Sequence, residues 1–138
     1  ALPENGKLLC CDVSEEWTAI AREHWIKAGV EEKIDLVIAP ASKTLADLPV
    51  DKKIDFAFID ADKSGYLEYY EAIVPRLSEH GLIAIDNVLW SGRVVHSEVS
   101  DSDTISIKKF NDHVSEDERV SSVMLSIGDG LTLVKRAD

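Results

Sequence analysis

Cysteine and methionine are scarce in this 138-residue chain, which has two cysteines and one methionine. Cys10 and Cys11 are adjacent in an apolar run, so neither a zinc-ligand spacing nor a disulfide framework can be recognised. Because proteins without disulfides are typical of reducing compartments, we predict a cytoplasmic location.

Long apolar segments and an excess of basic residues are also missing. No apolar run approaches the roughly 20 residues needed to span a bilayer, and no signal peptide is recognisable. Lys and Arg total 15 against 26 Asp and Glu, which gives a net charge of −11. Since nucleic acids and anionic membranes attract basic surfaces, we expect neither as a partner and expect a small-molecule ligand instead.

A glycine-rich turn is absent as well, because no G-x-G-x-x-G or similar cluster occurs. Nucleotide-binding α/β folds usually begin with a central strand that leads into such a turn. The sequence starts at Ala1-Leu2-Pro3 without a methionine. We therefore expect the chain to be truncated at its N-terminus.

The apolar residues, 45% of the chain, predict one α/β domain over residues 1–138. Residues 56–59 and 82–85 lack polar alternation, which is typical of parallel strands covered on both faces. Residues 65–77 have helical spacing, and Gly81 is expected to end that helix. The other predicted elements are strands at 7–12 and 34–38, helices at 15–28, 41–48 and 104–114, a loop at 88–100, and an antiparallel hairpin of 120–126 with 131–134. This order predicts a doubly wound sheet.

Acidic side chains end the two continuous apolar strands. Asp60 follows the first strand, and Asp86 and Asn87 follow the second. Parallel strands about 4.8 Å apart would bring these oxygen ligands to one cation, for which Mg²⁺ is favoured, with Mn²⁺ or Ca²⁺ as alternatives. Lys63 is close enough in sequence to reach this crevice, either as a base beside the cation or as a solvated surface lysine. Acids that only cap the next helix are the simpler interpretation of each Asp taken alone.

Two further positions have both a functional and a structural interpretation. Asp12 ends the first predicted strand, where an acid often binds a ribose, but it can equally cap the following helix with Ser14. Trp90 follows Asn87 and can form an apolar wall for an aromatic ligand, or it can simply pack. Trp17 and Trp25 lie eight positions apart on a predicted helix and are expected in the core.

Several stretches together resemble the cation-dependent O-methyltransferases of the caffeoyl-CoA and catechol type. They are I-D-A-D-K at residues 59–63, the Tyr66 to Tyr70 segment, D-N-V-L-W at residues 86–90 with Ser91 and Gly92, and G-D-G-L-T at residues 128–132. The similarity runs from end to end. It implies a Rossmann-like class I methyltransferase fold without its first strand, and methyl transfer from S-adenosylmethionine to a hydroxyl of a vicinal aromatic diol.

The resemblance also implies roles for individual residues. Asp60, Asp86 and Asn87 match the metal ligands, and Lys63 matches the general base, which also contacts the substrate. The positions expected near the cofactor are Asp12, Ala41, Asp60 and Asp62. Trp90 and Ser91 are expected near the acceptor, with Ser91 in place of an Asn of the plant enzymes. Since the family is commonly dimeric, a homodimer is also expected.

Two alternatives remain open at this point. An apolar strand followed by D-x-D is also found in Mg²⁺-dependent phosphohydrolases of the haloacid dehalogenase type, although there a Thr or Val usually takes the place of Lys63. The other alternative is a catalytically inactive fragment, since the segment with the Gly-rich turn and its strand precedes Ala1 in the family.

Overall fold

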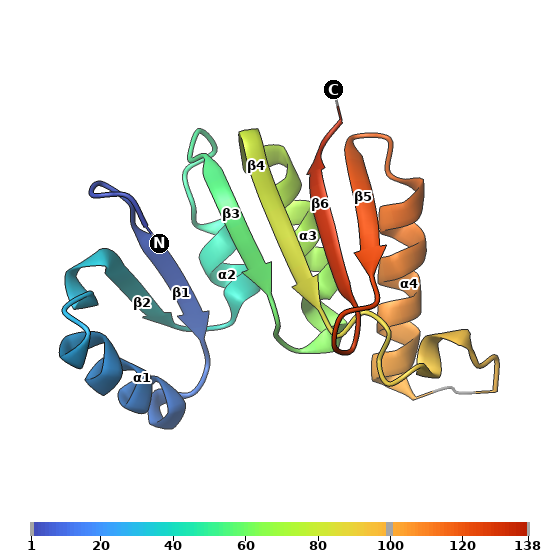
Figure 1. Ribbon diagram of the computed structural model, residues 1–138, viewed down its shortest axis with the longest axis horizontal. Coiled ribbons are helices and arrows are strands. Elements are labelled where there is room, and N and C mark those ends of the chain that lie inside the picture. Colours follow the sequence, from blue (N-terminus) through green and yellow to red (C-terminus); the bar gives the residue numbers. More distant parts are fainter. Residues whose placement is uncertain (1, 99–100, 138) are drawn as a thin grey trace. The chain divides into compact units, whose positions relative to one another are not determined.

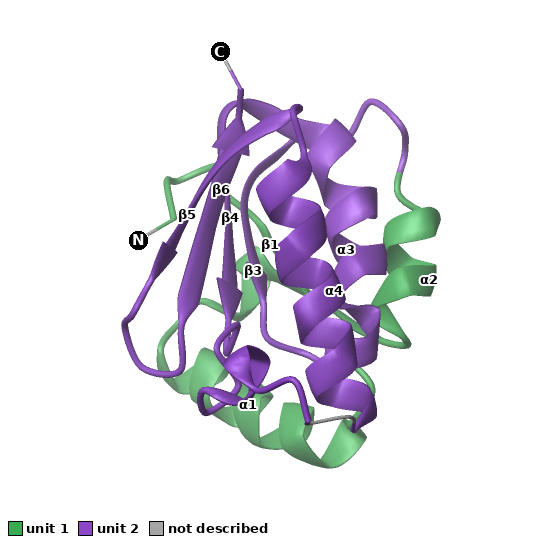
Figure 2. Cartoon of the chain, turned by 90° about the vertical axis from the view of Figure 1, so that its right-hand side faces the viewer, with its two compact units in different colours: residues 1–48 green, residues 49–138 purple. Residues whose placement is uncertain are grey.

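The computed structural model describes residues 2–98 and 101–137 and divides into two compact units. The first unit runs to Leu48 and the second begins at Pro49 (Figure 2). Within the described ranges, no helix has both the length and the apolar character required to cross a membrane. The single domain predicted for residues 1–138 stays a prediction.

The first unit is a parallel βα unit. Leu8–Asp12 forms β1 and Ile34–Ile38 forms β2, and the two pair in parallel from Leu8 opposite Ile34. Between them lie helix α1 (Glu15–Lys27) and a 3₁₀ turn (Glu31–Lys33), and helix α2 (Ala41–Ala46) follows β2 (Figure 1). These elements agree with the prediction to within one or two residues at most ends.

The predicted core positions of α1 are wrong in part. Trp17 is 66% exposed and Trp25 is half-buried, and Thr18 is the one buried residue of the helix. The apolar spacing indicated the helix correctly, but an apolar stripe is buried only when another element packs against it. In this unit the sheet has just two strands, which offer little surface to cover an indole.

The second unit is a four-stranded mixed sheet in the order β3-β4-β6-β5 (Figure 1). β3 pairs with β4 in parallel, whereas β6 is antiparallel to both β4 and β5, so the predicted hairpin is confirmed. The residues of the elements are β3 Ile54–Ile59, α3 Tyr66–Ile73, β4 Leu77–Asp86, α4 Ser102–Glu116, β5 Val120–Leu125 and β6 Leu131–Arg136, with 3₁₀ turns at Lys63–Gly65, Val74–Arg76 and Arg93–Val95. Val99 and Ser100, part of the predicted loop, lie outside the described residues.

Helices α3 and α4 lie on one face of this sheet (Figure 2). Ile83, Ile85 and Val134 point to that face and are fully buried. The rings of Tyr66 and Tyr70 each pack edge-on against Phe110 of α4, with centroids 5.7 and 5.8 Å apart. The core of the unit therefore lies between these two helices and β4 and β6.

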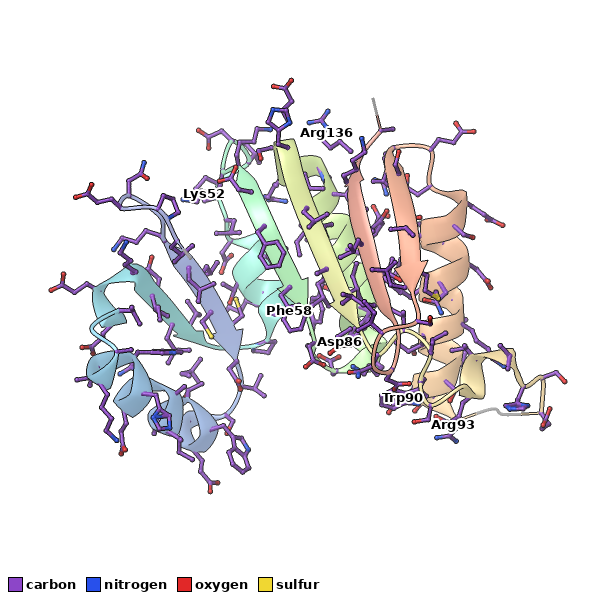
Figure 3. The ribbon with its side chains drawn as sticks, in the orientation of Figure 1. Lys52, Phe58, Asp86, Trp90, Arg93 and Arg136 are labelled. Atoms are coloured by element: carbon purple, nitrogen blue, oxygen red, sulfur yellow. The ribbon has the colours of Figure 1, made fainter. Side chains whose placement is uncertain are left out.

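The other face of the sheet is open at β3. Phe56 and Phe58 are 59% and 57% exposed, so the expectation of a strand covered on both faces is wrong for the described structure. The side chain of Phe58 is labelled in Figure 3. The continuous apolar run did predict a parallel strand correctly, because β3 pairs in parallel with β4. Burial of its second face requires a covering layer, which the strand's own sequence does not encode.

We expected Gly81 to end the helix that corresponds to α3. This expectation is wrong, because Gly81 lies inside β4. The helix ends earlier, through the 3₁₀ turn that contains Pro75. A Cβ at residue 81 would lie 2.8 Å from the carbonyl oxygen of Ile54, where the register between β3 and β4 shifts. Gly81 thus allows the close approach of two strands at a bulge.

A cluster of charged residues joins α3 to the end of α4. Arg119 donates to both oxygens of Glu71 and of Asp117, Tyr70 donates to Asp117 at 2.8 Å, and Nε2 of His113 lies 2.6 Å from Glu71. The ligand atoms of Glu71, His113 and Asp117 lie within 4.8 Å of one another, as in a metal site. The guanidinium already occupies the carboxylates, so the cluster is best described as an ion-pair network.

We expect this network to make the stability of the fold fall in acid. Hydrogen bonds from Arg119 hold the pKa of Asp117, and that of Glu71, below their ordinary values. A carboxyl group with a depressed pKa in the folded state stabilises the fold above its unfolded pKa of about 4, and this contribution is lost as pH falls. Arg119→Met should cost about 1–2 kcal/mol at pH 7 and less at pH 3.

Thermal unfolding of the parent and of Arg119→Met from pH 7 to pH 3 measures this effect. Replacement of the exposed Arg22 by Met is the control. A destabilisation by Arg119→Met that is the same at both pH values would contradict the prediction.

Candidate active site

The carboxyl ends of β3 and β4 bring the two predicted acidic positions together. Ile59 pairs with Ile85 in parallel register. Asp60 directly follows β3, and Asp86 is the last residue of β4. Asp86 lies at the same end of the sheet as Trp90, opposite the end that carries Lys52 and Arg136 (Figure 3). The backbone N–H of Asn87 donates to Oδ1 of Asp86 at 2.7 Å, which fixes one carboxylate oxygen.

Lys63 is buried at the centre of this strand-end site, with an 8% exposed side chain. Its Nζ donates to Oδ1 of Asn87 at 3.1 Å and lies 3.5 Å from Oδ1 of Asp60. It also donates to the hydroxyl of Tyr66. Because burying a lysine is costly without partners, the interpretation of Lys63 as a solvated surface residue is wrong.

The oxygen ligands at the ends of β3 and β4 have no His or Cys among them. Asp60, Asp86 and Asn87 offer two carboxylates and one amide oxygen, and Lys63 Nζ already contacts two of these three side chains. This donor chemistry fits a hard divalent cation such as Mg²⁺ and does not favour zinc. The predicted role of the three residues as metal ligands stays a prediction.

Asp62 is held by its own turn. Tyr69 donates to Oδ1 at 2.5 Å and Ser64 donates to Oδ2 at 2.9 Å. Partial burial raises the pKa of Asp62, but these two hydrogen bonds, together with those from the backbone of its own turn, outweigh it, and the pKa lies below its ordinary value. The carboxylate is therefore ionised and fixed in direction, as a contact to a polar ligand requires.

The loop after β4 adopts an unusual backbone. Asn87, Trp90 and Ser91 have positive φ angles of 58°, 49° and 53°. Such angles are uncommon for residues with a side chain, and for a bulky one like Trp they mark strain of the kind found at functional sites. The Trp90 ring lies 5.3 Å from Lys63 Nζ, and within the described ranges its buried indole N–H has no acceptor.

The turn between β5 and β6 holds this loop in place. Asp129 accepts the backbone N–H of Ser91 on Oδ1 at 2.5 Å and that of Leu89 on its carbonyl at 2.9 Å. Gly130 has a φ of 86°, and a Cβ there would lie 2.5 Å from the Leu89 side chain. Sequence analysis used G-D-G as a hairpin turn and as part of the family resemblance, but it missed this contact, since nothing local links residues 129 and 91.

Tyr66 is a second residue that sequence reasoning missed. Its side chain is fully buried, and its hydroxyl accepts from Lys63 and donates to the carbonyl of Asp86 at 3.0 Å. Burial first, and then the charges of Asp60 and Asp86, raise the pKa of Tyr66. Its helical spacing predicted a place in the apolar stripe of α3. Its hydroxyl was the one sequence signal for a polar contact.

Asp12 and Ala41 belong to the first unit and are described within it. Asp12 ends β1, and its Oδ1 accepts the backbone N–H of Ser14 at 2.8 Å, which agrees with the capping interpretation. The N–H of Ala39 donates to the Asp12 carbonyl at 2.9 Å, so the start of α2 at Ala41 lies at the same end of the two-stranded sheet. Their predicted roles at the cofactor stay predictions.

Comparison with known proteins places these observations in a family. Residues 1–137 match the O-methyltransferase family model. The chain belongs to the O-methyltransferase family. It is 44% identical over 140 residues to the "Probable caffeoyl-CoA O-methyltransferase 1" of Dictyostelium discoideum, covering 99% of this chain and 61% of that protein. The caffeoyl-CoA O-methyltransferase of Stellaria longipes is 35% identical over 99% of this chain and 60% of its own length.

Solved structures agree with the O-methyltransferase assignment. The S-adenosylhomocysteine-bound methyltransferase PaMTH1 of Podospora anserina superposes with a TM-score of 0.84 at 28% identity, over 96% of this chain and 61% of that one. The predicted Rossmann-like class I methyltransferase fold is thereby confirmed. The chain spans about three fifths of the length of the curated relatives it matches.

Proposed function

We propose that this member of the O-methyltransferase family carries the metal-binding and proton-accepting part of a site that transfers a methyl group from S-adenosylmethionine to a hydroxyl of a vicinal aromatic diol. The observation that supports it most directly is the buried Lys63, whose Nζ lies 3.1 Å from Asn87 Oδ1 and 3.5 Å from Asp60 Oδ1. A lysine held among oxygen donors at the ends of two parallel strands can both meet a bound hydroxyl and take its proton.

The chemistry assigns separate tasks to these side chains. Asp60, Asp86 and Asn87 would hold a divalent cation, which when bound makes a neighbouring hydroxyl more acidic. Lys63 would take the proton of that hydroxyl on Nζ. The oxygen would then form a bond to the methyl carbon of S-adenosylmethionine while the carbon–sulfur bond breaks, and S-adenosylhomocysteine would leave. The protein contributes mainly position and charge.

Other parts of the proposal concern the two substrates. Asp62, ionised and fixed by Tyr69 and Ser64, would contact the methyl donor. For Asp12 and Ala41 of the first unit, the cofactor roles implied by the family resemblance are kept as separate proposals. Trp90 and Ser91 would contact the acceptor. We also propose a cytoplasmic location and leave the homodimer as a proposal from the family resemblance.

Family membership counts against the phosphohydrolase alternative. Lys63 also lies buried beside Asp60, so the first Asp of the D-x-D pair faces an amine. The inactive fragment is tested together with the proposal.

Calorimetric titration of the purified chain with S-adenosylmethionine tests the proposed function. We expect saturable one-to-one binding in Mg²⁺, followed by methylation of a catechol but not of the matching monophenol, and loss of methylation in a chelator. The monophenol is the control for the need of two adjacent hydroxyls. Absence of both binding and methylation from a chain that unfolds cooperatively would favour the inactive fragment.

A further inference from the structure

The hydroxyl of Tyr66 lies between the amine of Lys63 and the backbone of Asp86. It donates to the Asp86 carbonyl oxygen at 3.0 Å and accepts a hydrogen bond from Lys63 Nζ. A phenol has a single proton, and that proton is directed to the carbonyl. The oxygen therefore presents a lone pair to Lys63. Although Nζ lies 4.5 Å from the ring centroid, it meets the hydroxyl at the edge of the ring, so the contact is a hydrogen bond.

Tyr66 is rigid enough to fix the position of another side chain. It is fully buried, and its ring packs edge-on against Phe110 at an interplanar angle of 84°. Because a phenol ordinarily titrates near pH 10, the hydroxyl keeps its proton near neutral pH. It is thus suited to hold Lys63 in place and is not suited to take a proton itself.

Lys63 has few other hydrogen-bond partners that would remain when a cation is bound. Three side-chain oxygens among the described residues contact Nζ, those of Tyr66, Asn87 and Asp60. Two of them belong to proposed metal ligands, whose oxygens would turn to the cation. A lysine side chain has about 2 kcal/mol of rotamer entropy to lose, so one fixed partner strongly favours one position.

We propose that Tyr66 is a positioning residue that holds Lys63 Nζ beside the acceptor hydroxyl and ties it to the strand end that carries Asp86. Its catalytic part rests on the proposed function. The contact itself, a buried phenol that sets the place of a buried amine, stands independently of it.

Tyr66→Phe, compared with Tyr70→Phe, tests this proposal. Tyr70 is a matched control because it lies on the same helix, is fully buried and packs edge-on against the same Phe110, but its hydroxyl donates to Asp117. For Tyr66→Phe we expect kcat of methyl transfer to fall about 10–100-fold with KM of the acceptor changed less than about threefold. Tyr70→Phe should keep kcat within about twofold.

A second measurement does not depend on activity. Lys63 is acetylated with a limiting amount of an acetyl N-hydroxysuccinimide ester at one fixed pH, and mass spectrometry compares its rate with that of the exposed Lys109. Both variants are compared at a temperature where circular dichroism shows each of them folded. Freed from Tyr66, Lys63 should react at least about fivefold faster in Tyr66→Phe, with no change in Tyr70→Phe.

The two measurements separate the possible results. Equal acetylation of Lys63 in the two variants overturns the proposal, as does a faster reaction in Tyr66→Phe with unchanged kcat. If the parent transfers no methyl group but the acetylation rates differ as expected, the proposed function fails while the positioning of Lys63 by Tyr66 stands.

Discussion

Lys63→Ala is expected to lower kcat of methyl transfer by about 10³-fold, while S-adenosylmethionine still binds with nearly unchanged affinity. A positioned base typically contributes about 10²–10⁴-fold to the rate, and Lys63 is the proposed base. In the described structure its Nζ contacts Tyr66, Asn87 and Asp60, none of which offers a second amine in its place. Initial rates with a catechol acceptor and calorimetry with the methyl donor measure the two effects.

Lys63→Met and Lys109→Ala are the controls for this result. Met keeps most of the length and the apolar stem of the buried side chain, so a rate as low as that of Lys63→Ala assigns the loss to the amine and not to packing. Lys109 is exposed on α4 and its replacement should leave the rate within about twofold. If Lys63→Ala keeps more than a tenth of kcat, Lys63 is not the base.

The adjacency of Asp60 and Asp86 could be predicted from the sequence, and the structure has it. Two continuous apolar runs separated by a helix-length segment are typical of neighbouring parallel strands, and β3 and β4 are such strands. Their carboxyl ends then carry whatever residues follow them. This inference needs only the period of the pattern and the length of the connection, both of which are local.

The contacts that fix the site could not be predicted, because they are made between distant segments. Tyr66 of α3 is three residues from Lys63, but its hydroxyl reaches the carbonyl of Asp86 at the end of β4. Asp129, in the turn between β5 and β6, accepts the backbone N–H of Ser91. The apolar spacing predicts that Tyr66 lies in the core. This prediction is correct for its ring, but the spacing gives no information about what its hydroxyl contacts. Likewise the period of α1 predicted the helix but not that Trp17 is exposed.

Phe56 and Phe58 show the same limit at the scale of the sheet. An apolar strand predicts its own pairing, and β3 pairs as expected on one side. Among the described residues its other edge has no strand partner and one of its faces is open. A sequence pattern indicates which side chains favour burial, but the layer that buries them is a property of the rest of the fold.

Asp86→Asn is expected to weaken Mn²⁺ binding by about 100-fold, with Mn²⁺ as the spectroscopic stand-in for Mg²⁺. The change removes one negative charge from a proposed ligand set of two carboxylates and an amide, and a hard cation depends on carboxylate charge. It is nearly isosteric, and the amide oxygen of the new side chain can still accept the N–H of Asn87 that Asp86 accepts at 2.7 Å. Electron paramagnetic resonance of free Mn²⁺ measures the affinity.

Two further variants decide where the cation binds. Asp112→Asn removes the same charge from an exposed position of α4 and should leave the affinity unchanged. Glu71→Gln alters the cluster of Glu71, His113 and Asp117, the other place where ligand atoms gather, and it too should have no effect because Arg119 occupies those carboxylates. Loss of Mn²⁺ binding in Glu71→Gln but not in Asp86→Asn would show that the metal does not bind at the strand ends. Lys63 would then have no cation beside it to make a hydroxyl acidic.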